Sequence, residues 1–295
     1  MFQLSQWIAV VAGIATLGLA LGGCSEAPEP DETAGDGEEI AAARGAGTNV
    51  AVPAVRAETQ ALIDAYTADV LTSLKRSADF LAAQQTVGFL TDVAFDVVQA
   101  NGQLLEFGGT RDVLMRRPDR LRIESVDADG GVKQLFFDGK SILVDIPTED
   151  VYVRMERPGT LYAALDYLVE DLGAPAPLED FMSENFATGV EDRIVSGFYV
   201  QRVMLGDSVC AQLAWRTEAV DVQLWIQEGE EPVPCRLVIT YKNAEGHPEF
   251  AADFHGWNFA PEADDDMFTF TPPKTAERLQ VRTFIRELRD DMEGK

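Results

Sequence analysis

The spacing of apolar residues changes along the chain and indicates where helices give way to strands. From Glu58 to about Gln85 large apolar side chains recur near helical spacing, which predicts one long amphipathic helix. From Phe89 to Val98 every second side chain shares a face, as in a β-strand. Asn101-Gly102 then predicts a tight hairpin into a second strand over 103–115.

Further strand-like segments follow at short intervals. Asp129-Gly130-Gly131 and Asp138-Gly139 supply turns between them. Connections this short leave no room for parallel crossovers, so the strands are expected to form an antiparallel meander. Its later strands are predicted at Leu121–Val126, Val132–Phe137, Ser141–Ile146 and Val151–Met155.

A helical insert and a second meander complete the pattern. The insert covers about Gly159 to Asn185, and Pro177 begins a short second helix within it. The second meander is predicted at Phe198–Leu205, Cys210–Arg216, Val222–Gln227, Cys235–Lys242 and Glu249–Trp257, with Phe268–Pro273 closing the sheet. A last amphipathic helix is expected from about Ala276 to Met292.

These elements predict an α+β fold that is mainly β, since strands lie on both sides of a central helical insert. No internal repeat is strong enough to divide the domain, so both meanders are expected to join in one long, strongly curved antiparallel sheet. Helices can cover only one face of such a sheet. Its concave face is therefore expected either to be filled by the helices or to hold a ligand.

The N-terminal segment resembles a bacterial lipoprotein signal peptide. Residues 1–23 carry no charged side chain, and Ile8 to Leu21 form an apolar run too short for a comfortable membrane span. The run ends in Leu21-Gly22-Gly23-Cys24, which is similar to the site where lipoproteins are cleaved and acylated. We expect lipidation of Cys24, although a cysteine at the end of a membrane anchor is the alternative. Ser25, in place of Asp, favours the outer membrane.

The residues after Cys24 predict a tether followed by one folded domain. Residues 24–55 are acidic and hold hardly any large apolar side chain, so this segment is expected to stay disordered and the domain to span 56–295. The chain carries a formal net charge of -26, from 50 Asp and Glu against 24 Lys and Arg. Such a surface repels phosphate backbones, so nucleic acid is excluded as a partner.

Cys210 and Cys235 are the remaining cysteines, and two arguments about them oppose each other. In an oxidising envelope two thiols tend to form a disulfide. Regular antiparallel strands would place these two on either side of a middle strand, roughly 9–10 Å apart, which is too far for a bond. A bulge, or an early end of the middle strand, would bring them together.

The sequence offers no catalytic, metal or cofactor site. His247 and His255 lack the spacing of a metal pair, and no HExxH or CxxC motif occurs. There is no G-x-S-x-G elbow and no P-loop. We therefore expect no enzyme activity and no cofactor.

Several short motifs recur in a recognisable order and spacing between about Glu58 and Pro273. They are Arg116–Arg122, Phe137–Asp145, Pro158–Leu161, Asp221–Ile226 and Phe268–Pro273. Together they resemble a predicted periplasmic family of unknown function, DUF2092. That family is similar in architecture to the LolA and LolB lipoprotein carriers and to the mycobacterial lipoproteins LppX and LprG.

This resemblance implies an unclosed half-barrel around helices, with an apolar cavity suited to acyl chains. The first hypothesis is an envelope lipoprotein that binds a lipid or another hydrophobic molecule, as a carrier or chaperone. The second is a non-enzymatic interaction or sensor protein whose half-barrel is filled by its own helices and docks an envelope protein. Candidate ligand-lining residues, each of which could instead be ordinary core, are Phe89, Val93, Phe95, Val97, Leu121, Ile123 and Val144.

Overall fold

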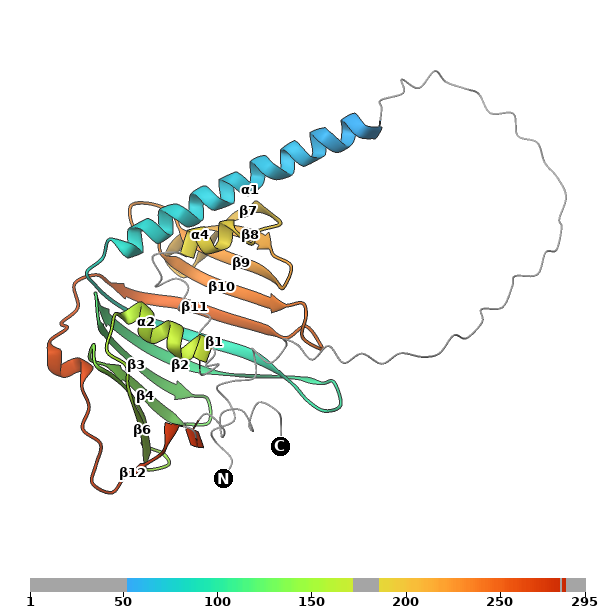
Figure 1. Ribbon diagram of the computed structural model, residues 1–295. Coiled ribbons are helices and arrows are strands. Elements are labelled where there is room, and N and C mark those ends of the chain that lie inside the picture. The colour runs from blue at the N-terminus through green and yellow to red at the C-terminus, as the bar shows by residue number, and fades with distance from the viewer. Residues whose placement is uncertain (1–51, 172–185, 282, 285–295) are drawn as a thin grey trace, which may run out of the picture.

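The computed structural model describes residues 52–171, 186–281 and 283–284 (Figure 1). The predicted signal peptide, Cys24, most of the tether and the helix expected after Pro177 lie outside these ranges. The first element, α1, is a long helix over Val52–Ala82. The predicted helix is therefore confirmed, but it begins earlier and takes in residues 52–55, which the sequence assigned to the tether.

The described strands form one twelve-stranded sheet that curves without closing into a barrel, and the fold is mainly β, as predicted. The first meander is regular and matches the sequence-based boundaries closely. Its strands are β1 (Thr86–Val98), β2 (Leu104–Arg116), β3 (Arg120–Asp127), β4 (Val132–Phe137), β5 (Ser141–Ile146) and β6 (Val151–Glu156). At the β1–β2 hairpin Gly102 has a φ of 80°, a left-handed conformation that glycine adopts without strain.

The second meander extends the same sheet from the other side of β1. Its strands are β7 (Ser196–Leu205), β8 (Ser208–Arg216), β9 (Val220–Gln227), β10 (Pro234–Tyr241) and β11 (Glu249–Asn258). The strand order is β12-β6-β5-β4-β3-β2-β1-β11-β10-β9-β8-β7, so β11 pairs with β1 and joins the two halves. The single continuous sheet predicted from the sequence is confirmed.

Helices pack against one face of the sheet, which we call the inner face and which carries Phe89, Val93 and Phe95 of β1. Helix α1 contacts β7 and β8 and buries Val70 and Leu74 completely. The insert supplies α2 (Leu161–Asp166), continued by a π-helical turn over Tyr167–Asp171, and α4 (Phe186–Glu191) packs against α1. In Figure 1 α2 and α4 both lie over this face.

Arg117, from the first family motif, ties the long helix to the sheet and the insert. Its guanidinium donates hydrogen bonds to the carbonyl oxygens of Gln84 and Leu81, at 3.1 and 3.2 Å, where α1 ends. It also lies over the ring of Tyr162 in α2. The motif is thus a structural junction between three elements.

The sequence-based prediction is wrong at the end of the sheet. Phe268–Pro273 forms no strand, because Pro272 and Pro273 have no N–H to donate to a ladder. A 3-10 turn over Asp265–Phe268 instead buries Phe268 fully, and Phe270 stacks on Phe136 at 5.2 Å on the outer face.

The sheet is extended at that edge by a strand that the sequence did not suggest. Strand β12 (Glu277–Arg278) pairs in parallel with β6. The last helix therefore cannot begin at Ala276. The amide of Phe284 donates to the carbonyl of Gln280 at 3.0 Å, and Phe284 is buried in the core.

Cys210 and Cys235 form a disulfide, with their Cα atoms 6.8 Å apart. Cys210 pairs with Gln227, the last residue of β9. On the other side the register shifts between Pro234 and Arg236, so Cys235 is an extra residue in its strand. The bulge and the early end of the middle strand together bring the two cysteines within bonding distance, so the disulfide forms although regular strands would keep them apart.

Gly108 and Gly109 show why glycine stands inside β2. The register of β2 with β1 runs through both residues without a bulge, and the pairing of β2 with β3 begins at Gly109. A Cβ at Gly108 would collide with the carbonyl oxygen of Val93, and one at Gly109 with that of Val126. The pair therefore permits the backbones of β1, β2 and β3 to approach one another closely.

Candidate ligand-binding face

Every predicted ligand-lining residue lies on the inner face. Phe89, Val93, Phe95 and Leu121 are buried in the main hydrophobic core, and Val97, Ile123 and Val144 pack against it while half-buried. The structure thus brings the set together on one surface spanning β1, β3 and β5.

Strand register arranges the inner face in rows that run across the sheet. One row passes from Phe89 through Val113, Ile123 and Leu135 to Val144. Its first two residues are buried, whereas Ile123, Leu135 and Val144 are only half-buried. Along this row the inner face is therefore covered less completely over β3, β4 and β5 than over β1 and β2, whereas the neighbouring row of Leu121, Phe137 and Ile142 is fully buried.

An aromatic cluster closes one end of this face. The ring of Trp257 in β11 stacks on Phe89 at 4.6 Å and lies 6.0 Å from Phe254. Phe259 follows Trp257 at 6.2 Å and meets Phe80 of α1 edge-on at 5.1 Å. Offset and edge-on rings at these separations stabilise one another, so the cluster fixes α1 against β1 and β11.

A second row across the inner face is polar, and the sequence analysis missed it. Thr91, Arg111, Ser125 and Lys133 occupy successive partner positions on β1, β2, β3 and β4. Asp127 lies two residues beyond Ser125 on the same face. Its carboxylate contacts Lys133 Nζ at 2.7 Å and Arg111 Nη2 at 3.2 Å.

The charges of this polar row are buried. The side chains of Arg111, Asp127 and Lys133 are 11%, 6% and 10% exposed. Burial lowers the pKa of Arg111 and of Lys133, while the hydrogen bonds and charge of Asp127 act in the opposite direction. The hydroxyl oxygens of Thr91 and Ser125 are buried without a hydrogen-bond partner among the described atoms.

Apart from the polar row, the side chains named on the inner face are apolar. His255 is half-exposed and its Nδ1 lies 3.9 Å from Asp92. Within the ranges that the structure describes, no group of His, Cys, Asp and Glu is arranged to hold a metal ion. In the same ranges no helix is long and apolar enough to cross a membrane.

Comparison with known proteins supports the family indicated by the motifs. A family profile described as "Predicted periplasmic protein (DUF2092)" matches residues 71–282. No curated protein matches the chain.

Several solved structures are similar to the chain at low identity. Mycobacterium tuberculosis lipoprotein LppX is 12% identical, with 66% of this chain and 98% of that chain covered and a TM-score of 0.43. LprF from Mycobacterium bovis is 11% identical, with 70% and 97% covered and a TM-score of 0.43. A LolA superfamily protein from Nitrosomonas europaea is 12% identical, with 68% and 96% covered and a TM-score of 0.31.

Proposed function

The chain belongs to the DUF2092 family of predicted periplasmic proteins, and we propose that it is an envelope lipoprotein that binds a hydrophobic ligand on its inner face. The ligand would be a lipid or an acyl chain, and the protein would act as its carrier or chaperone. Binding would be non-covalent, and the proposal assigns no catalytic residue.

The half-buried row on the inner face is the observation that carries this proposal. Ile123, Leu135 and Val144 are apolar, adjacent across three strands and only partly covered. An acyl chain laid along them would remove their remaining apolar surface from water, at about 25 cal/mol per Å².

The N-terminal anchor completes the proposal. Acylation of Cys24 would hold the protein on a membrane, with the outer membrane preferred because Ser25 follows the cysteine. Residues 25–51 would then form an acidic tether, since α1 begins at Val52. Two or more acyl chains on one residue anchor firmly, whereas one chain binds only marginally.

A fluorescent fatty acid tests the site directly. We expect Ile123→Asp to weaken its binding strongly, because a carboxylate at this half-buried position would have to lose water. Val126→Asp is the matched control, since Val126 is on the same strand but 39% exposed on the outer face. Equal binding by both variants, with both folded, would exclude the inner face as the site.

A second candidate function rests on the packing of the helices. Val70 and Leu74 of α1 and Leu161 of α2 are fully buried, so the protein's own helices fill part of the inner face. A half-barrel filled in this way would serve as an interaction or sensor module that docks an envelope protein. This alternative predicts no bound lipid and no fatty-acid binding.

A further inference from the structure

Strand β7 is an edge of the sheet that the described part of the chain leaves open. It has a neighbouring strand on one side only, whereas β6, near the other edge, is paired with β12. Helix α1 packs against the first part of β7, where the amide of Gly197 donates to Thr67 Oγ1 at 3.0 Å and residues 196–199 line a groove with the helix. The later residues of β7, such as Met204, stay exposed, and an edge strand of this kind is a template for pairing with another strand.

The side chains along this edge are apolar and exposed. Phe198, Tyr199, Val200 and Met204 of β7 are 51%, 49%, 41% and 59% exposed. Arg202 is the charged residue of the strand, and it pairs with Glu228 at 2.8 Å. Natural edge strands are usually protected by charge, proline or a covering element, so this composition indicates an interaction surface.

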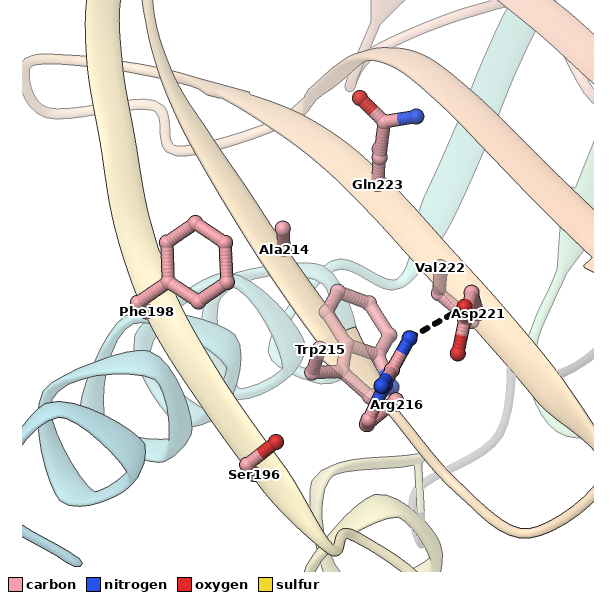
Figure 2. A pocket seen from close by; sticks show the side chains of 8 residues that line it. All are labelled: Ser196, Phe198, Ala214, Trp215, Arg216, Asp221, Val222 and Gln223. Carbon is pink, nitrogen blue, oxygen red and sulfur yellow. Dashed lines mark hydrogen bonds and ion pairs between the residues drawn. The ribbon is translucent and has the colours of Figure 1, made fainter. Parts of the chain in front are cut away.

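Hollows flank both faces of the strand. One groove of about 440 Å³ lies between α1 and β7 and is lined by Ile63, Tyr66 and 196–199. The other, of about 350 Å³, lies over β7, β8 and β9 and includes Phe198, Ala214 and Gln223 (Figure 2). In Figure 2 the Arg216–Asp221 ion pair lies at its lower end.

We propose that β7 binds an extended, cationic segment of a partner protein, which adds a strand to the sheet. An added strand points alternate side chains to opposite faces, so it can fill both hollows while its backbone pairs with the edge. A flat bilayer surface would engage only one of them. The occupant is thus a strand rather than a membrane.

The net charge of the chain favours a different protein, rather than a second copy of this chain, as the partner at β7. Two copies would each bring a formal net charge of -26 to the contact, and like charges of this size repel. Exposed acidic side chains outnumber basic ones at the ends of the strand, with Glu191 and Asp192 against Arg193 before it and Asp207 after it. A segment with lysine or arginine between its apolar residues is complementary to this surface.

The test uses the full chain carrying Cys24→Ala and a labelled synthetic peptide of alternating valine and lysine, about ten residues long to match a strand. We expect saturable binding that weakens at least about tenfold, or about 1.4 kcal/mol, for Phe198→Lys/Met204→Lys. Val126→Lys, a charge added on an exposed residue of β3, should bind like the unsubstituted chain. Both variants must keep the same thermal unfolding midpoint.

A second probe needs no variant. The same peptide with alternate backbone nitrogens methylated keeps its side chains but cannot form a ladder, and its binding should fall by a similar factor. Equal binding of the methylated peptide, or no effect of the double variant, would overturn the proposal. Two other results would also overturn it: a dimer of the unsubstituted chain in sedimentation that the double variant abolishes, or recruitment to phosphatidylcholine vesicles that the double variant abolishes. Fatty-acid binding should be unchanged throughout, which separates this surface from the inner face.

Discussion

The Nζ atom of Lys133 lies 2.7 Å from Oδ2 of Asp127, in the interior of the protein rather than at its surface. Oδ1 of the same carboxylate faces Arg111 at 3.2 Å. One carboxylate therefore contacts two buried cations on the inner face. Replacing one member of a buried ion pair costs more than replacing one at the surface, because the remaining charge stays out of water.

Asp127→Asn should destabilise the fold by about 3–5 kcal/mol, because it removes a charge that faces both Arg111 and Lys133. Urea denaturation of the variant and the parent measures the difference. Asp79→Asn is the matched control, since the Lys75–Asp79 pair has the same 2.7 Å separation but side chains 67% and 64% exposed. The control should lose less than about 1 kcal/mol. Equal losses in the two variants would contradict the argument.

Asp145 is a buried carboxyl group that should make the stability of the fold depend on pH. Burial raises its pKa, and the charge of Asp150 raises it further. The folded protein therefore tolerates the neutral carboxyl better than the carboxylate, and the contribution of Asp145 to stability falls as the pH rises through its folded-state pKa.

Asp145→Asn should accordingly be more stable than the parent at pH 7. Its advantage should shrink as the pH falls through the raised folded-state pKa of Asp145 and should be gone by about pH 4, where the carboxyl group is protonated in the unfolded chain as well. Denaturation at several pH values gives the difference between the two proteins. An advantage that is independent of pH, or a variant less stable at pH 7, would show that this account of Asp145 is wrong.

The disulfide should contribute to stability through the unfolded chain. It joins residues separated by 25 positions, and closing a loop of this size stabilises by about 3 kcal/mol. We expect Cys210→Ala/Cys235→Ala to lower the unfolding free energy by about that amount and to keep the parent's fatty-acid affinity. A protein that lacks Cys24 should show no free thiol before denaturation and reduction. Finding two reactive thiols in the folded protein would contradict the bond.

Cys24→Ala tests the proposed anchor. The variant should lose incorporation of labelled palmitate and move from the membrane fraction to the soluble fraction, because the other two cysteines of the chain, Cys210 and Cys235, form a disulfide. Immunoblots of the two fractions measure the change. A variant that remains in the membrane fraction would favour an uncleaved membrane segment instead.

Local sequence patterns predicted most of the strands but not the rows of side chains that run across them. Alternation placed β1 to β11 closely, since each strand exposes one face to the core. The polar row was missed because Thr91, Arg111, Ser125 and Lys133 are neighbours only through register, which sets partners far apart in the chain. Strand β12 has two residues and no pattern to recognise.

The resemblance to a family supplied what local patterns could not. It implied the half-barrel and a cavity, and it led to inner-face residues as candidates. The disulfide stayed open because one bulged residue, Cys235, decides it, and a bulge leaves no mark in apolar spacing. The exposed apolar edge at β7 could not be foreseen, since the strand reads like any half-buried strand until its missing neighbour is known.

The central claim is that the inner face holds a hydrophobic ligand, and the ligand itself can be sought. The full chain carrying Cys24→Ala would be purified from the periplasm without detergent and its organic extract analysed by mass spectrometry. Roughly equimolar lipid, retained by Val126→Asp and lost from folded Ile123→Asp, is the predicted result. Folded, lipid-free protein that also fails to take up fatty acid would contradict the claim.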